Sequence, residues 1–233
     1  MRRWSMAVAL VCAVSLVATP AAGDDASATD LQAIIDNAAP GATINLGSGD
    51  YVGGVTIDKP LSLIGTGTTV IDGGGVGTVV EITAPDVTIE NVTIRGSGAS
   101  LDREDAGVSA GNERTTIRNS RFEDVLFGIF LRASPDSVIQ DNVIGAKDVF
   151  IANRGDGIRL WESERSIVEN NVIEGGRDTV FWFTNEVVVR GNQVSDGRYG
   201  LHFMYSDGAV IEDNVLNGNS VGAFMMYSRD VEI

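Results

Sequence analysis

The fold is indicated by a stretch that reads Ile167-Val168-Glu169-Asn170-Asn171-Val172-Ile173 and returns along the chain. Similar stretches contain Asn142, Asn192 and Asn214. Asn171, Asn192 and Asn214 are 21 and 22 residues apart, Asn142 precedes Asn171 by 29, and Ser120 takes the same place 22 residues before Asn142. A nearly fixed period with one insertion is typical of the stacked coils of a β-solenoid.

The repeated asparagines have a structural interpretation. Asparagine tolerates the left-handed backbone of a tight corner, and stacked copies can hydrogen-bond to one another along the solenoid axis. We therefore expect Asn142, Asn171, Asn192 and Asn214 to form a ladder rather than a catalytic site.

The rest of the pattern predicts an all-β chain with a helical cap. Leu31, Ile34 and Ile35 have helical spacing, with Thr29 or Asp30 as N-cap and Pro40-Gly41 as terminator, so a short helix should cover the open end of the first coil. The residues from Ala146 to Asp156 form the insertion in the long coil and should protrude as a loop. Short strands are expected at 43–46, 55–57, 61–64, 69–71, 79–82 and 87–94.

The N-terminus has the layout of a secretory signal peptide. Arg2 and Arg3 precede an apolar run and small residues, which predicts a leader over residues 1–23 with cleavage somewhere in 21–28. The only cysteine, Cys12, lies in that leader, so the mature domain at 29–233 should have no disulfide. We expect an exported protein, periplasmic or at the outer face of the cytoplasmic membrane. Because Ile233 falls in mid-coil, we also expect the chain to be the N-terminal piece of a longer protein.

The charge of the chain excludes some partners. The 233 residues carry 32 acidic and 17 basic side chains, a formal net charge of −15 at pH 7. A surface of this kind repels polyanions, so we expect no nucleic-acid partner. The apolar run of the leader is too short for a membrane span, and none is expected.

A second repeat lies between the asparagine turns and carries unusual side chains. Aligned on a glycine, it reads Gly157-Ile158-Arg159-Leu160-Trp161, Gly200-Leu201-His202-Phe203-Met204 and Gly222-Ala223-Phe224-Met225-Met226, with Thr179-Val180-Phe181-Trp182-Phe183 between them. Because side chains alternate across a strand, this alignment places Val180 and Trp182 inside. The predicted outward set comprises Phe130, Arg159, Phe181, His202 and Phe224 in one file and Arg132, Trp161, Phe183, Met204 and Met226 in the next.

The outward set predicts a binding surface, because a contiguous exposed apolar patch on a soluble acidic protein usually marks one. The residues expected to bind a partner are Trp161, Phe181, Phe183, Tyr205, Phe224 and Tyr227. Within the same face, His202, Met204 and Met226 are close enough to converge on one metal ion. Thioether and imidazole together suit Cu(I), since soft ligands select the soft ion, although plain packing of these side chains remains an alternative.

Several of these segments resemble the NosD family, which are periplasmic β-helix proteins of nitrous oxide reductase maturation. The resemblance rests on Arg154-Gly155-Asp156-Gly157-Ile158-Arg159-Leu160-Trp161, on the opening Leu31 to Thr43, and on the paired Met204-Tyr205-Ser206 and Met226-Tyr227-Ser228. It implies a right-handed parallel β-helix. It also implies an accessory role in supplying copper to nitrous oxide reductase, together with an ABC transporter and a copper chaperone.

Two other functions stay open at this point. A carbohydrate-active enzyme could use the same fold, but a hydrolase needs two carboxylates about 5 to 9.5 Å apart, and no aligned strand positions carry such a pair. The one dense acidic group, Asp102, Glu104 and Asp105, is interpreted as a solvated loop, and we expect no catalytic site. A metal-free docking scaffold would use the same aromatic face.

Overall fold

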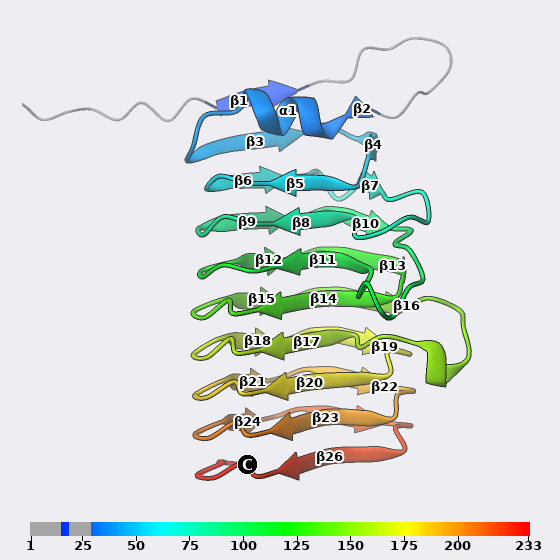
Figure 1. Ribbon diagram of the computed structural model, residues 1–233, viewed down its shortest axis with the longest axis vertical. Coiled ribbons are helices and arrows are strands. Elements are labelled where there is room, and N and C mark those ends of the chain that lie inside the picture. Colours follow the sequence, from blue (N-terminus) through cyan, green and yellow to red (C-terminus); the bar gives the residue numbers. More distant parts are fainter. Residues whose placement is uncertain (1–14, 19–28) are drawn as a thin grey trace, which may run out of the picture.

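The computed structural model describes residues 15–18 and 29–233, which form a stack of parallel coils running from α1 at one end to β26 at the other (Figure 1). Consecutive coils contribute strands to three parallel sheets, here called sheets A, B and C. The predicted parallel β-solenoid is therefore confirmed.

Each sheet follows the chain coil by coil. Sheet A contains β1 (Ser15–Ala18), β3 (Ala42–Leu46), β6 (Leu61–Ile64), β9 (Val87–Glu90), β12 (Thr116–Arg118), β15 (Val138–Gln140), β18 (Ile167–Glu169), β21 (Val188–Arg190) and β24 (Val210–Glu212). Sheet B contains β2 (Thr29–Asp30), β4 (Gly49–Val52), β7 (Thr69–Asp72), β10 (Thr93–Arg95), β13 (Arg121–Val125), β16 (Val143–Ala146), β19 (Val172–Glu174), β22 (Gln193–Ser195) and β25 (Val215–Asn217). Sheet C contains β5 (Val55–Ile57), β8 (Val80–Ile82), β11 (Ala106–Ala110), β14 (Phe127–Arg132), β17 (Ile158–Trp161), β20 (Asp178–Trp182), β23 (Tyr199–Met204) and β26 (Val221–Met226).

The core consists of aliphatic files that repeat from coil to coil. In sheet A, Ile117, Ile139 and Val168 pair in register across β12, β15 and β18, and each is at most 1% exposed. Neighbouring strands lie about 4.8 Å apart, so like side chains stack in contact along the axis. The single strand predicted at 87–94 is wrong, because Asn91 has φ 61° and divides it into β9 and β10.

The predicted asparagine ladder is confirmed. Asn142 donates from its backbone N–H and its Nδ2 to Asn171 Oδ1, both at 3.0 Å, and Asn171 repeats these bonds to Asn192 Oδ1 at 3.0 and 2.9 Å. Asn192 does the same with Asn214. The left-handed conformation, however, belongs to the residue before each ladder asparagine, for example Asn170 at φ 56° and Asp213 at φ 52°.

The capping helix α1 (Leu31–Asn37) begins at Asp30, whose side chain accepts a hydrogen bond from Ala33 N–H at 3.1 Å. Leu31 and Ile35 are fully buried against the first coil, as predicted. Gln32 also occupies the open edge of sheet C, because its amide bonds both backbone groups of Thr56, at 2.8 and 3.1 Å. The helix thus covers exposed backbone as well as apolar surface.

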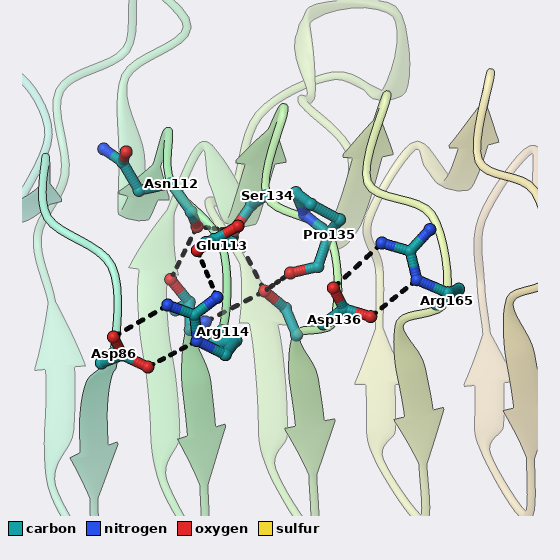
Figure 2. Close-up of polar contacts among 10 residues, drawn as sticks. Asp86, Asn112, Glu113, Arg114, Ser134, Pro135, Asp136 and Arg165 are labelled. Atoms are coloured by element: carbon teal, nitrogen blue, oxygen red, sulfur yellow. Dashed lines mark hydrogen bonds and ion pairs between the residues drawn. The ribbon is translucent and has the colours of Figure 1, made fainter.

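Ion pairs link successive coils at one corner. Arg114 binds Asp86 of the preceding coil in a two-point contact of 2.6 and 2.9 Å, and Arg165 binds Asp136 at 2.8 and 3.0 Å (Figure 2). These hydrogen bonds lower the pKa of Asp86 and Asp136. Since all four side chains are well exposed, salt should screen them.

The insertion between β16 and β17 projects from the stack and contains η1 (Ile151–Asn153) (Figure 1). The protruding loop predicted for Ala146 to Asp156 is therefore confirmed. Apart from β1, the predicted signal peptide lies outside the described residues. Within the ranges 15–18 and 29–233, no helix has the length and apolar character needed to cross a bilayer.

Candidate functional site on the outer face of sheet C

The structure brings His202, Met204 and Met226 together on the outer face of sheet C. His202 and Met204 lie on β23 with their side chains on the same side of the sheet, and Met226 on β26 is paired in register with Met204. His202 is paired in register with Phe224 of the same strand β26. The predicted metal-ligand set thus shares one surface, and Met204 and Met226 are partly exposed there.

The prediction that Phe181 faces outward is wrong. Phe181 pairs with Leu160 and Phe203, is 0% exposed, and stacks on Phe203 in the core with ring centroids 4.6 Å apart. Its neighbours Val180 and Trp182, predicted to be inside, face outward and pair with His202 and Met204.

A short coil and a β-bulge explain this error. Asn171 and Asn192 are only 21 residues apart. In the structure Asp178 therefore lies opposite Gly157, whereas the alignment on glycine puts Thr179 there. The register then shifts at β23 between the pairs Asp178–Tyr199 and Val180–His202. Alignment from the following corner would have found the register, because Thr184, Ser206 and Ser228 form a hydroxyl ladder there.

His202 lies in an aromatic surround. The rings of Tyr199, Trp182 and Phe224 approach its imidazole at 4.9, 5.5 and 5.5 Å in edge-on arrangements, and the residue is only 6% exposed. Its Nδ1 faces Asp178 Oδ2 at 3.4 Å, whereas Nε2 is buried and has no hydrogen-bond partner among the described residues. A neutral imidazole that donates from Nδ1 has its lone pair on Nε2, the arrangement common in metal-binding histidines.

Asp178 is the carboxylate that orients this histidine. Burial by itself raises its pKa, but hydrogen bonds from His202 and Arg198, with the charge of Arg198, lower the pKa to about 2. Asp178 is therefore ionised at neutral pH. Asp178 and Trp182 were not identified from the sequence as neighbours of His202. The one available signal was that Asp178 takes the position of Gly157 in the next coil.

The first of the two predicted outward files is mostly buried, contrary to the prediction of an exposed patch, whereas every member of the second file is at least partly exposed. Phe130 and Arg159 are 3% and 8% exposed, and the Arg159 guanidinium lies 4.8 Å from the Phe127 ring and 5.3 Å from the Phe130 ring. Arg159 also bonds Glu104 at 3.2 Å, from a loop 55 residues earlier. Trp161 packs against this cluster and stays partly exposed, and Phe224 on β26, beside His202, is partly exposed as well.

Three of the residues predicted to bind a partner are exposed at the next corner, as expected. Phe183, Tyr205 and Tyr227 stack with centroids 5.1 and 4.9 Å apart and with rings within 9° of parallel. They are 44%, 45% and 68% exposed, and each has φ near 50°. A bulky side chain rarely adopts this left-handed backbone. We call these three residues the aromatic ladder; Trp161 joins it at 5.9 Å from Phe183.

The acidic group at 102–105 is only partly solvated. Asp105 is 1% exposed and accepts hydrogen bonds from Ser100 N–H at 2.9 Å and from Arg103. Glu104 binds Arg132 and Arg159. The interpretation as a solvated loop is therefore wrong for Asp105, which fastens the loop, and holds for exposed Asp102.

Comparisons with known proteins show which family the chain resembles. A family described as periplasmic copper-binding protein (NosD) matches residues 140–233. Two proteins called probable ABC transporter binding protein NosD match as well. The one from Pseudomonas aeruginosa is 32% identical over 137 residues, 58% of this chain and 32% of that protein, and the one from Stutzerimonas stutzeri is 33% identical over 136 residues, 57% and 31%.

The fold is shared with solved structures of low sequence identity. The surface adhesin PfbA of Streptococcus pneumoniae superposes with a TM-score of 0.60 at 12% identity, covering 86% of this chain and 72% of the adhesin. The chain spans about a third of the length of the curated NosD relatives. The resemblance to the NosD family is thus confirmed, with residues 140–233 matching its family of periplasmic copper-binding proteins.

Proposed function

We propose that this chain is part of a non-catalytic, exported accessory protein that handles Cu(I) during assembly of the copper sites of nitrous oxide reductase. Its partners would be an ABC transporter at the inner membrane, a copper chaperone and the reductase itself. The family description supports copper binding in the periplasm, and the names of the relatives support the link to an ABC transporter.

One observation carries the proposal: the unpaired Nε2 of His202 lies on the same sheet face as two methionines in adjacent coils. An unpartnered buried polar atom costs free energy, roughly 1–3 kcal/mol, unless a ligand satisfies it. One imidazole nitrogen and two thioether sulfurs form a soft donor set that suits Cu(I).

The chemistry of these residues suits such an ion. Asp178 already orients the imidazole, and carboxylate partners of this kind raise the basicity of a ligating histidine. Met204 and Met226 are partly exposed, and their unbranched side chains can turn toward Nε2. Phe224 and Trp182 would flank the ion and limit its contact with water.

A competitive Cu(I) titration tests the proposal. The parent should bind one Cu(I), and a Met204→Leu/Met226→Leu variant should bind at least about tenfold more weakly, because leucine conserves volume without a donor sulfur. Met225→Leu is a matched control, since Met225 is next to Met226 on β26 but pairs with Phe203 and packs against the core. Equal affinity of the parent and the double variant would exclude the methionines as ligands.

The aromatic ladder favours a second candidate function, a docking scaffold that holds no metal. Three stacked, exposed rings in an unfavourable backbone conformation are difficult to explain by stability alone. They follow one another on three successive coils, and aromatic residues are enriched in interfaces.

One experiment distinguishes the copper function from the docking function. A Phe183→Ser/Tyr205→Ser variant should retain Cu(I) affinity and lose binding to a purified copper chaperone, measured by surface plasmon resonance. If the parent binds the chaperone but no Cu(I), the scaffold function replaces the copper function. A variant that binds the chaperone as the parent does would remove the ladder from the interface.

A further inference from the structure

Arg177, in the turn before β20, has no hydrogen-bonded side-chain partner within residues 29–233. Its side chain is only 27% exposed, and its Nε is buried and unpaired. The nearest carboxylate oxygen, Asp156 Oδ1, is 3.6 Å away, beyond hydrogen-bond length. Asp156 Oδ2 is bound instead by Arg159, at 2.7 Å from Nε and 2.6 Å from Nη2. A half-buried guanidinium with free donors is unusual, because such groups are normally paired.

A second arginine lies directly beside it in the next coil. The backbone N–H of Arg198 donates to the carbonyl of Arg177 at 2.7 Å, which puts both residues in one file along the solenoid axis. Like charges in adjacent strands destabilise a sheet unless counter-charges are near. Arg198 has one in Asp178, which it binds through Nε at 3.0 Å and through Nη2. The nearest counter-charge of Arg177 within residues 29–233 is Asp156, which lies 3.6 Å away and is already bound by Arg159.

Both arginines line a pocket of about 310 Å³, together with Ile151, Ala152 and Ser220. Ile151 and Ala152 belong to η1, so the protruding insertion forms one wall. Arg154 fastens that wall, since its Nε donates to Val149 O at 2.8 Å and its Nη1 to Gly175 O at 2.9 Å. The volume is at the small end of the range for ligand pockets, about 300–1,000 Å³.

We propose that this pocket, the arginine pocket, binds an oxyanion such as phosphate, sulfate or a carboxylate. The planar donor fork of a guanidinium matches the oxygens of these groups, and the partly apolar wall reduces competition from water. An anion would satisfy Arg177 and relieve its repulsion with Arg198. The site is built from residues that take no part in the copper proposal, apart from Asp178, which faces both Arg198 and His202.

Copper-free protein is titrated with phosphate, sulfate or acetate in an isothermal calorimeter, at an ionic strength held constant with chloride. The parent should bind at one site, and Arg177→Gln should lower the affinity at least about tenfold without a loss of folded structure, because the backbone hydrogen bonds of residue 177 remain and the Arg177 side chain makes no hydrogen bond among the described residues. Arg121→Gln is the control: Arg121 is 55% exposed and its nearest carboxylate oxygen lies 3.8 Å away, on the outside of sheet B.

A second variant and a second set of probes complete the test. Ile151→Glu would place a carboxylate in the pocket and should displace the anion. Short peptides with free or amidated C-termini identify the source: binding of inorganic anions indicates a free anion, and binding of the free-carboxylate peptide alone indicates the terminus of a partner. The proposal is overturned if no probe binds the parent, or if Arg177→Gln binds as the parent does.

Discussion

Replacement of Asn171 tests whether the asparagine ladder stabilises the solenoid. Asn171→Ala removes the acceptor of Asn142 N–H and the donor to Ile139 O, which lie 3.0 and 2.9 Å from the amide atoms. Asn142 Nδ2 keeps its bond to Ile117 O at 2.9 Å, so two buried groups, Asn142 N–H and Ile139 O, each lose a hydrogen bond to Asn171. At about 1–3 kcal/mol each, the free energy of unfolding should fall by roughly 2–6 kcal/mol.

Asn171→Asp sharpens the test because it conserves shape. The new carboxylate oxygen would replace Nδ2, which now donates to Ile139 O and Asn192 Oδ1 at 2.9 Å, so a negative charge would face two acceptors. We expect a larger loss at pH 7 than for alanine. Burial would raise the pKa of this carboxyl above its unfolded value, so stability should return as the pH falls and the acid becomes a donor.

Urea unfolding followed by far-UV circular dichroism measures both variants, with an unchanged slope required before midpoints are compared. Asn153→Ala is the control, because Asn153 is exposed on η1 and should change stability by less than about 0.5 kcal/mol. An Asn171→Ala protein as stable as this control would refute the assignment of a stabilising role to the ladder.

Three further predictions concern the packing of the core, the stability of the protein in acid, and the ion pairs at the corner of the coils. Phe181→Ala should destabilise by about 3–5 kcal/mol and Phe183→Ala by less than about 1 kcal/mol in the same urea assay, and the opposite order would contradict the register of β20. Since the pKa of Asp178 is lowered to about 2, its contribution of roughly 2 kcal/mol should be present above pH 4 and lost as the pH falls toward 2, and the stability difference from Asp178→Asn should shrink over that range. Arg165→Gln should lower the melting temperature slightly at low salt and not at 1 M NaCl, and a salt-independent loss would mean that its contact with Asp136 is not chiefly electrostatic.

The candidate site could be predicted only in part. His202, Met204 and Met226 are correctly placed because β23 and β26 are 22 residues apart and strand alternation does the rest. Phe181 is misplaced because one coil is a residue shorter and a bulge restores the spacing later, so two compensating changes are hidden in an almost regular period. A one-residue slip moves every side chain of a strand to the other face.

The partners of charged residues were harder to predict than their positions. Arg159 meets Glu104 across 55 residues, and Asp105 is buried within a loop that composition alone suggests is solvated. Such contacts depend on how the insertions fold back over sheet C, and no repeat encodes them. That Arg177 Nε has no hydrogen-bond partner among the described residues can be recognised only when the contacts of every nearby carboxylate are known.

The solenoid, its helical cap, its asparagine ladder and its protruding loop could all be predicted from the sequence, because each follows from local periodicity and from residues with narrow backbone preferences. Three features are evident only in the folded chain: which aromatic rings are buried, the stacking of the exposed rings at the corner, and the pocket lined by Arg177. Those outcomes depend on the register between coils and on the packing of insertions, which are set by contacts between distant residues.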